Sequence, residues 1–587
     1  MAIPIPDIPE NAPLDADQRS WLQAWLAEAI PKAEAESLTG GKPRVVLMFG
    51  SESGNAQALS EGFAERLTES GWLADAVDMA DFEKVDLTKE HLLLILTSTW
   101  GEGDPPENAI DFWTAFTQDN YPKLDGLKYS ILALGDTNYT DFCEMGRKFD
   151  GRLEQLGAKR FAPRVDCDVD YEDPAEEWFE VVVSQLDQMD FSDIKVALPP
   201  VSEISKAEEK PATDLPYSRK NPFRSKLLKN FYLNKKGSLK DTRHLELSLA
   251  GSDLSYEVGD VLGLFPKNDP ELVDEMLSIM PFNTKISVMA HNGQKMHLRD
   301  ALIELYDIRT IAKSTMKKWA ALCHHPWLNA VIDDSDEINK IIDGREIIDL
   351  LYDFPADFKN AQDFVAVLRK LNPRLYSIAS SINAHPEEVH LTIAKVEYNT
   401  HGRHRKGVAS TFACDRLETG KRVGIFLQGA KHFKLPEDTT RDVIMVGPGT
   451  GIAPFRAFLE ERKVSQATGR NWLFFGNPHE ATDYFYEEEF EHLQVEGVLN
   501  RLDLAWSRDQ AQKVYVQNKM DDAAEELWKW VEGGSHLYVC GDATYMAGDV
   551  DKALHDAVEK FGGLSEIEAA DYVAQMKTDK RYQRDVY

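Results

Sequence analysis

An alternation of apolar runs, polar loops and amphipathic segments most constrains the fold of this chain. It begins with RVVLMFG at 44–50, which leads through a polar loop into QALSEGFAERL, and it recurs through HLLLILTSTW and KYSILALGDTNY. Near-continuous apolar strands that alternate with helices are typical of a parallel sheet covered by helices on both faces. The same alternation returns from DVIMVGPGTGIAPF onward. The sequence therefore predicts an α/β multidomain protein with a doubly wound sheet near each end.

Between these two regions the pattern changes to short alternating strands. RHLELSL and DVLGLFP precede a helix-rich stretch at about 268–368, and RLYSIAS, VHLTIAKVEY and RVGIFLQ follow it. Strands on both sides of a helical segment predict an antiparallel β-barrel with an all-helical insertion.

The predicted domain boundaries follow these changes of pattern. We expect an N-terminal segment with a short helix at 1–43, an α/β domain at 44–192, a linker at 193–216, the barrel with its insertion at 217–440 and a second α/β domain at 441–587. The linker is assigned because ALPPVSEISKAEEKPATDLP is rich in Pro, Ala, Ser and Glu and has no periodicity. Trp21 and Trp25 share one face of the expected N-terminal helix. This helix either packs on its own domain or mediates oligomerisation or docking of a partner.

Charge and cysteine content exclude several classes of protein. Lys and Arg total 66, Asp and Glu total 99, and the net charge is −33. This balance argues against nucleic-acid or anionic-membrane binding, because phosphates require a basic surface. The 5 cysteines never form a Cys-x-x-Cys pair, so we expect no disulfide scaffold, zinc site or iron–sulfur cluster. The start MAIPIPDIPENAP lacks a signal-peptide pattern and no apolar run reaches ~18 residues, which predicts a soluble cytoplasmic protein.

Three loops of the first α/β region carry the residue types of a flavin site. The loop at 51–56 offers hydroxyls and helix-terminal amides, which suit a terminal phosphate. TSTWGEGDPPENA and LGDTNYTDFC place aromatic residues beside glycines, as a flat isoalloxazine ring requires. Each loop alone also fits an ordinary strand-to-helix turn. Together they predict one site, because ligands of open α/β sheets bind at the carboxyl ends of the strands.

On these motifs, the segment 44–190 resembles the flavodoxin-like FMN domain of the diflavin reductases. The resemblance implies phosphate contacts from Ser51, Glu52, Ser53, Gly54, Asn55 and Ala56, ring contacts from Ser98, Thr99, Trp100 and Gly101, and ribityl and ring contacts from Leu134, Gly135, Asp136, Thr137, Asn138, Tyr139, Thr140, Asp141, Phe142 and Cys143. Acidic residues surround these loops: Glu102, Asp104, Glu107, Asp136, Asp141, Glu144, Asp166, Asp168 and Asp170. They form either a solvated face or a docking surface for a basic partner.

The barrel region carries two further motifs, NPRLYSIASS and GRHRKGVAST. Arg can pair with a pyrophosphate, Tyr can stack on a flavin, and small residues at a helix start bring amides to phosphate. The motifs R-x-Y-S and G-V-A-S resemble the FAD domain of the ferredoxin-NADP reductase type. This resemblance implies FAD contacts from Arg374, Leu375, Tyr376, Ser377, Thr392, Ala394, Tyr398, Gly407, Val408, Ala409 and Ser410.

The last domain opens with a glycine-rich turn before a helix, formed by Gly447, Gly449, Thr450 and Gly451. The turn differs from G-x-G-x-x-G, so by itself it would be a weak Rossmann signal. WSRDQAQKVYVQ is more specific and resembles the family's site for the 2′-phosphate of NADPH. The residues concerned are Ser507, Arg508, Lys513, Tyr515 and Gln517, with Asp549 assigned to the same nucleotide. A solvated basic helix end is the alternative.

HLYVCGDATYMAGDV places Cys540 at the end of another predicted strand, where it could be an ordinary buried thiol. In the family the matching Cys lies beside the nicotinamide, with the Ser of R-x-Y-S and an acidic residue near the C-terminus. Those would be Ser377 and Asp585 here, and Tyr587 would be the terminal aromatic residue that shields the flavin. The resemblance thus implies a catalytic set of Ser377, Cys540, Asp585 and Tyr587, with no metal.

The resemblance covers 44–587 in the order FMN domain, linker, FAD domain and NADPH domain. It implies an NADPH-dependent oxidoreductase, a diflavin reductase that passes electrons through FAD and FMN to an external haemoprotein. GNPHEATDYFYEEEF, DLAWSRDQ and RYQRDVY resemble the sulfite reductase branch, whose acceptor is a beta subunit with sirohaem and an iron–sulfur cluster.

Two alternatives to that branch are considered. Trp100 and GDPPENA are more similar to reductases that feed haem monooxygenases or nitric oxide synthases, so a soluble reductase for a haem oxygenase is the first alternative. The second is a flavodoxin-like carrier without turnover, against which the complete NADPH site argues.

Overall fold

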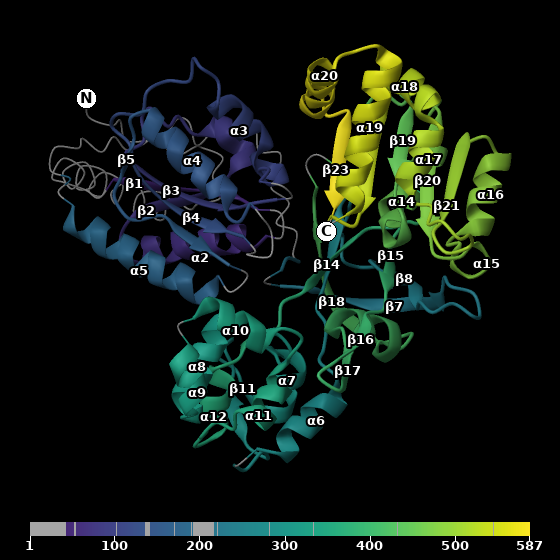
Figure 1. Cartoon of the computed structure of the whole chain (residues 1–587). Coiled ribbons are helices and arrows are strands. Elements are labelled where there is room, and N and C mark those ends of the chain that lie inside the picture. Colours follow the sequence, from purple (N-terminus) through teal and green to yellow (C-terminus); the bar gives the residue numbers. More distant parts are fainter. Residues whose placement is uncertain are drawn as a thin grey trace, which may run out of the picture. The chain divides into compact units, whose positions relative to one another are not determined.

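The computed structural model describes residues 43–51, 54–100, 103–135, 141–168, 171–189, 191, 217–219, 221–280, 282–332, 334–430, 433–543 and 545–586. The expected N-terminal helix and the whole of the predicted linker at 193–216 lie outside these residues. The chain divides into two compact units, Met1–Ala212 and Thr213–Tyr587, which are described separately (Figure 1). The finer domain boundaries expected from the sequence remain predictions.

The first unit is a parallel sheet with the order β2-β1-β3-β4-β5, and β6 pairs with β4. Its strands are β1 (Arg44–Gly50), β2 (Leu73–Asp78), β3 (Leu92–Ser98), β4 (Lys128–Leu134), β5 (Lys159–Arg160) and β6 (Val165–Cys167). Its helices are α2 (Asn55–Glu69), α3 (Ile110–Phe116), α4 (Glu144–Gln155) and α5 (Glu172–Gln188), with 3₁₀ turns η1 (Met79–Lys84) and η2 (Glu107–Ala109).

Helices cover both faces of this sheet because alternate residues of a strand point to opposite sides. Val45 of β1 packs in a core with Phe63 of α2 and Phe179 of α5. Its neighbour Val46 packs in a second core, which includes Phe112 of α3. The predicted doubly wound, flavodoxin-like fold is confirmed.

The second unit begins with an antiparallel sheet in the order β14-β9-β18-β7-β8-β15. Its strands are β7 (Phe223–Tyr232), β8 (Thr242–Ser248), β9 (Val261–Leu264), β14 (Arg374–Ser377), β15 (Glu388–Ala394) and β18 (Arg422–Gln428). An antiparallel bridge between Ile378 and Leu391 connects the two outer strands. The sheet therefore closes on itself, and the predicted barrel is confirmed. Beside it lie the pair β16 (Glu397–Thr400) and β17 (Arg403–Lys406), then α13 (Val408–Thr411) and the π turn η3 (Phe412–Arg416).

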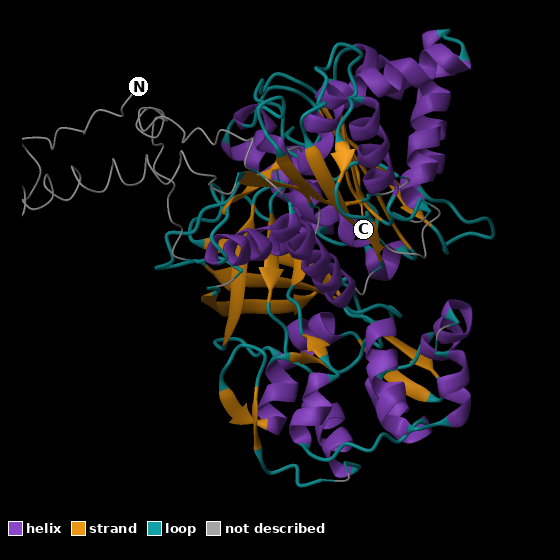
Figure 2. Ribbon diagram, turned by 90° about the vertical axis from the view of Figure 1, so that its left-hand side faces the viewer, coloured by secondary structure: helices purple, strands orange, loops and turns teal. Residues whose placement is uncertain are grey.

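The insertion between β9 and β14 is mainly helical, as predicted (Figure 2). It has its own core around Trp319 and Phe364. Its helices are α6 (Pro270–Ser278), α7 (Leu298–Glu304), α8 (Lys313–Cys323), α9 (Pro326–Val331), α10 (Ser335–Ile342), α11 (Ile347–Asp353) and α12 (Ala361–Ala366). It also contains short antiparallel pairs, β10 (Ser287–Met289) with β11 (Lys295–His297) and β12 (Tyr306–Asp307) with β13 (Arg369–Lys370). The expectation of an all-helical insertion missed these pairs because strands this short show no measurable alternation.

The last part of the second unit is a parallel sheet in the order β21-β20-β19-β22-β23. Its strands are β19 (Val443–Val446), β20 (Asn471–Asn477), β21 (Arg501–Trp506), β22 (His536–Gly541) and β23 (Tyr582–Val586). Its helices are η4 (Gly449–Ile452), α14 (Ala453–Val464), α15 (Glu480–Asp483), α16 (Glu487–Val495), α17 (Val516–Asp522), α18 (Ala524–Glu532), α19 (Met546–Gly562) and α20 (Glu566–Thr578). The second predicted α/β sheet is confirmed. In the described part of the chain, every helix is too short or too polar to cross a bilayer.

Candidate functional site

The loop after β1 is held in place by side-chain hydrogen bonds. Ser51 Oγ accepts a hydrogen bond from the amide of Ala56 at 3.2 Å, which satisfies a donor at the start of α2. The amide of Ser51 donates to Asn108 Oδ1 at 2.8 Å. Gly54 has φ 76°, a backbone conformation that favours glycine. The loop therefore leads directly into the N-terminus of α2, where a phosphate is stabilised by free amides.

Asn108 is a residue that the sequence analysis did not single out. Its side-chain amide also donates to Asp78 Oδ1 at 2.9 Å, so it connects the phosphate loop to the end of β2. Only 9% of Asn108 is exposed. A polar residue two positions after the second proline of GDPPENA was the available signal, and its burial could not be seen without the fold.

The second loop contacts the start of α4, the helix that follows the third loop. Trp100 and Asp104 exchange backbone hydrogen bonds of 2.9 and 2.8 Å, which hold these two positions of the second loop together. Thr99 Oγ1 accepts from the amide of Met145 at 3.1 Å, and Lys148 Nζ donates to the carbonyl of Gly103 at 2.7 Å. These bonds join the end of β3 to the start of α4. Because β1, β3 and β4 are neighbours in the sheet, the three loops gather at one edge, as the sequence predicts for FMN.

Several predicted FMN contacts lie outside the described residues: Glu52, Ser53, Gly101, Asp136, Thr137, Asn138, Tyr139 and Thr140. Of the remainder, Cys143 is buried, and burial raises the pKa of its thiol. A thiol of this kind packs and does not react. The other described residues of the set flank the three loops, namely Ser98, Leu134, Gly135, Asp141 and Phe142.

The acidic residues around these loops differ in their local pairing. Glu144 forms an ion pair with Arg147 at 3.0 Å, and Asp166 forms one with Arg164 at 2.8 Å. Their charge is therefore partly compensated within the domain. Glu102, Asp136 and Asp170 lie outside the described residues, as does the side chain of Glu107.

The predicted FAD residues lie on β14, β15, β16 and the start of α13. On β14, Arg374 is exposed while Leu375, Tyr376 and Ser377 are half-buried. At α13 the amide of Gly407 donates to Val396 O at 2.8 Å. A Cβ at Gly407 would lie 2.7 Å from Ser410 Oγ and 2.9 Å from Val396 Cβ, so a larger residue would force its neighbours to move.

Two other residues of the FAD set differ from each other in accessibility. Tyr398 is 45% exposed and is available for a ring contact. The Thr392 hydroxyl is buried and hydrogen-bonds Tyr486 at 2.6 Å. Its side chain is therefore already engaged with the last domain. Ala394, Val408 and Ala409 complete the described part of this set.

The glycine turn of the last domain lies directly on the end of β22. A Cβ on Gly451 would lie 2.1 Å from the carbonyl oxygen of Cys540, so only glycine fits. Gly449 has φ 60° and open space where a side chain would be. The turn therefore leaves backbone accessible in front of α14, beside Thr450, as a pyrophosphate site requires.

The residues assigned to the 2′-phosphate gather beyond β21. The amides of Ser507 and Arg508 donate to Asn477 O at 3.0 Å and Pro478 O at 2.9 Å, which fixes the start of the loop. Arg508 and Lys513 are exposed, and within the described part of the chain neither pairs with a carboxylate. Two unpaired cations close in sequence are suited to an anionic group.

The two remaining residues of this set lie at the start of the next helix, α17. Tyr515 precedes α17 and is 43% exposed. Gln517 Nε2 donates to Asp549 Oδ2 at 2.8 Å, so the structure brings these two predicted nucleotide contacts together.

The structure brings three predicted catalytic residues together from distant parts of the second unit. Ser377 Oγ donates to Asp585 Oδ2 at 2.7 Å, and Cys540 Sγ donates to the same oxygen at 3.6 Å. Cys540 and Asp585 are paired across β22 and β23. Burial raises the pKa of the Cys540 thiol, and the nearby Asp585 carboxylate raises it further, so Cys540 stays protonated. Tyr587 lies outside the described residues.

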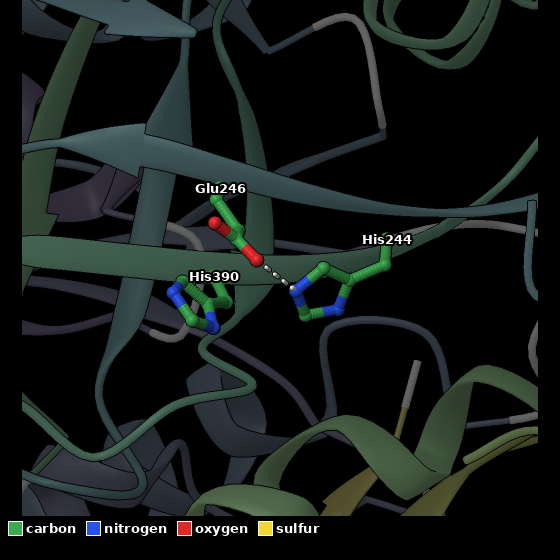
Figure 3. Close-up of side chains that lie close together, drawn as sticks. All are labelled: His244, Glu246 and His390. Atoms are coloured by element: carbon green, nitrogen blue, oxygen red, sulfur yellow. Dashed lines mark ion pairs between the residues drawn. The ribbon is translucent and has the colours of Figure 1, made fainter. Parts of the chain in front are cut away.

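A buried polar cluster lies where the barrel meets the last domain, and it includes His244, Glu246 and His390 (Figure 3). Buried Arg456 lies beside it, with Nη1 3.4 Å from His390 Nδ1. Burial, and then the positive charge of Arg456, lowers the pKa of His244 to about 2 and that of His390 to about 3. Both imidazoles are therefore neutral in the folded protein. The sequence analysis did not identify this cluster, because a histidine on a strand carries no signal of its surroundings.

We expect acid to destabilise the second unit through these two histidines. The unfolded chain binds a proton on each near its ordinary pKa of 6.5, whereas the folded chain does not until about pH 3. Their contribution is complete above about pH 6.5 and is lost as the pH falls, by about 1.4 kcal/mol per pH unit for each group. Urea unfolding between about pH 7 and pH 5 should therefore show a shallower loss for His390→Gln than for wild type.

Exposed His404 provides the matched control, since His404→Gln should keep the wild-type slope. His385 has the opposite effect on the free energy of unfolding as the pH falls, because its hydrogen bond to Glu460 raises its pKa. Identical slopes for His390→Gln and wild type would contradict a neutral buried His390.

Comparison with known families agrees with this architecture. The flavodoxin family matches residues 47–180, the FAD binding domain family matches 215–318 and 329–412, and the oxidoreductase NAD-binding domain family matches 445–552.

Relatives match over the whole chain. The sulfite reductase (NADPH) flavoprotein alpha-component of Bacillus subtilis (strain 168) is 43% identical over 589 residues, which cover 98% of this chain and 96% of the relative. The protein of the same name from Mannheimia succiniciproducens is 38% identical, with 100% and 99% coverage. That from Neisseria meningitidis serogroup B is 38% identical, with 100% and 98% coverage. With its flavodoxin, FAD-binding and NAD-binding domains in this order, the chain belongs to the family of sulfite reductase (NADPH) flavoprotein alpha-components.

Proposed function

We propose that this protein is the electron-input component of an NADPH-dependent sulfite reductase. It takes electrons from NADPH in its second unit and delivers them through FAD and FMN to a haemoprotein partner. The observation that carries the proposal is the meeting of Ser377 with Cys540 and Asp585, which brings the predicted FAD barrel and the predicted nucleotide domain to one point.

The residues present fit the three ligands by the chemistry of their donors. The N-terminus of α2 offers amides to the phosphate of FMN, and exposed Arg374 offers a guanidinium to the pyrophosphate of FAD. Arg508 and Lys513, which are exposed and form no ion pair with any residue that the structure describes, offer two cations to the 2′-phosphate of NADPH. When bound, FAD supplies two-electron chemistry with NADPH and releases electrons singly to FMN.

The chain's own residues orient the reacting groups. The turn at 447–452 receives the pyrophosphate, and the cations beyond β21 hold the other end of the nucleotide. Cys540 and Ser377 then provide small polar side chains beside the nicotinamide. The Asp585 carboxylate, shared by both, balances positive charge that develops on the nicotinamide ring.

The proposed acceptor is the beta haemoprotein subunit of sulfite reductase, with sirohaem and an iron–sulfur cluster. The relatives are sulfite reductase components over their full length, which supports this acceptor over the haem oxygenase that Trp100 favoured. The acidic residues around the FMN loops would face a basic surface of that subunit. The N-terminal segment at 1–43 is proposed to mediate oligomerisation.

The purified chain should contain FMN and FAD in equal amounts, because each flavin has its own set of binding loops. Acid extraction followed by chromatography of the released flavins measures this ratio. The same preparation should reduce cytochrome c with NADPH, and sulfite reduction should appear only when the beta subunit is added. A preparation that remains free of FMN after reconstitution would refute the two-flavin function.

A further inference from the structure

The buried cluster of His244, Glu246 and His390 has the composition of a metal site (Figure 3). Both ring nitrogens of His390, however, already have partners. Arg456 Nη1 lies 3.4 Å from His390 Nδ1, and a guanidinium can only donate, so Nδ1 accepts. Nε2 of the neutral ring then carries the hydrogen, which it donates to Glu388 at 3.1 Å.

His244 has one close partner, because its Nδ1 lies 2.9 Å from the Tyr486 hydroxyl while its Nε2 lies 3.7 Å from Glu246, beyond hydrogen-bond distance. A metal at His390 would need a lone pair that already accepts from Arg456, and it would face the positive charge of that guanidinium.

Arg456 makes hydrogen bonds to two domains. Only 7% of it is exposed. Its Nη1 donates to the carbonyl of Ala379 at 2.7 Å, in the segment that follows β14 of the barrel. In the last domain its Nε donates to Glu489 at 2.7 Å and its Nη2 pairs with Glu460 at 2.9 Å. These contacts use all three nitrogens of the planar, forked guanidinium, an arrangement that a lysine ammonium cannot reproduce.

The two residues joined by the hydrogen bond from Arg456 to Ala379 each lie close in sequence to the candidate site. Ala379 is two positions after Ser377, and Arg456 is five positions after Gly451. Gly451 packs against the backbone of Cys540 so closely that its Cβ would lie 2.1 Å from the carbonyl oxygen. Arg456 thus links the strand end that carries Ser377 to the turn that contacts Cys540.

The same helix holds the barrel segment at further points. Glu460 accepts from the amide of Ser381 at 2.9 Å and contacts His385 at 3.0 Å. Glu461 accepts from the Ser381 hydroxyl at 2.6 Å. Among these contacts, the hydrogen bond from Arg456 to Ala379 is the nearest in sequence to Ser377. It therefore holds the end of β14 most directly.

We propose that Arg456 is a positioning residue for electron transfer from NADPH to FAD, holding Ser377 in register with Cys540 and Asp585. The inference rests on the proposed function. Arg456 reaches neither nucleotide nor flavin through the contacts described, and it acts through the carbonyl of Ala379. Displacing reacting groups by about 1 Å can cost about 10²-fold in rate.

The test is Arg456→Lys, which keeps the buried charge and loses the fork. Stopped-flow absorbance should show the limiting rate of FAD reduction by NADPH lowered by about 10²-fold. The half-saturating NADPH concentration should change little, because Arg508 and Lys513 hold the nucleotide. The long-wavelength absorbance of the nicotinamide–flavin contact should weaken, while flavin content stays at the wild-type level.

Arg462→Lys on the same helix is the matched control. Arg462 is also buried, but it donates to Arg441 O at 2.9 Å and Gly469 O at 2.7 Å within the last domain. Its substitution should leave the limiting rate and the absorbance band unchanged. If Arg456→Lys does not fold, Glu489→Gln carries the test, with a smaller loss of rate expected in the same direction.

Wild-type reduction in the folded Arg456 or Glu489 variant, or an equal loss in Arg462→Lys, would overturn the positioning role. So would stoichiometric Zn²⁺ binding by the wild type that His390→Gln abolishes, because it would assign the cluster to a metal. If NADPH fails to reduce the FAD of the wild-type protein, the proposed function itself fails, and the inference fails with it.

Discussion

Cys540→Ala should slow the reduction of FAD by NADPH by about 10²-fold while both flavins remain bound. Cys540 is fully buried, and its thiol points to the Asp585 carboxylate at 3.6 Å. Removing it leaves a space beside the predicted nicotinamide position and takes one hydrogen bond from the carboxylate. The nucleotide then approaches the flavin in a less defined geometry, which lowers the rate of transfer and not the affinity.

Asp585→Asn and Ser377→Ala should show smaller losses of the same kind. Asp585→Asn keeps the hydrogen bond to Ser377 and loses the negative charge, whereas Ser377→Ala loses the hydrogen bond and keeps the charge. Comparing the two rates therefore separates the effect of charge from that of geometry. Stopped-flow absorbance isolates FAD reduction from later electron transfer to FMN. Cys414→Ala is the matched control, because Cys414 is a buried thiol in the barrel core. Wild-type reduction rates in Cys540→Ala would mean that this thiol only packs.

Arg508→Ala combined with Lys513→Ala should remove most of the preference for NADPH over NADH. Charge-assisted hydrogen bonds contribute about 1.5 to 3 kcal/mol each, so the two cations account for about 3 to 6 kcal/mol, or about 10² to 10⁴ in specificity. Both side chains are exposed in the structure, so their removal leaves no buried charge without a partner. The loss should fall on NADPH alone, since NADH lacks the 2′-phosphate.

Steady-state reduction of an artificial acceptor with each nucleotide measures kcat/KM and hence the ratio. Lys529→Ala combined with Lys560→Ala removes two exposed cations of the same domain and should keep the wild-type ratio. An unchanged ratio in the Arg508 and Lys513 variant would place the 2′-phosphate elsewhere.

Features that depend on local sequence could be predicted. The fully apolar run of β3 indicated a strand buried on both faces, and the structure has it inside a parallel sheet. The loop after β1 combined a glycine with hydroxyl residues, and the structure places it at the N-terminus of α2. Strand, turn and helix signals lie within a few residues of one another, so no knowledge of distant contacts was needed.

Features that depend on burial could not be predicted. Arg456 is a charged residue in a helix, and such residues are usually exposed. Arg456 can be buried because it hydrogen-bonds Ala379 and Glu489, which lie far from it in the sequence. The role of Asn108 could not be predicted either. Asn108 holds the phosphate loop through its hydrogen bond with Ser51, which lies far from it in the sequence.

The sequence by itself determined the kinds of elements, their order, and the residue types offered to a flavin or a nucleotide at each loop. Only the tertiary structure decided which of these residues meet. Ser377 and Asp585 are 208 positions apart and lie within hydrogen-bond distance. They meet because the barrel closes through Ile378 and Leu391 and because β23 pairs with β22 at Cys540. Such pairings bring together distant parts of the chain, and their energy comes from packing and hydrogen bonding that no local pattern of residues encodes.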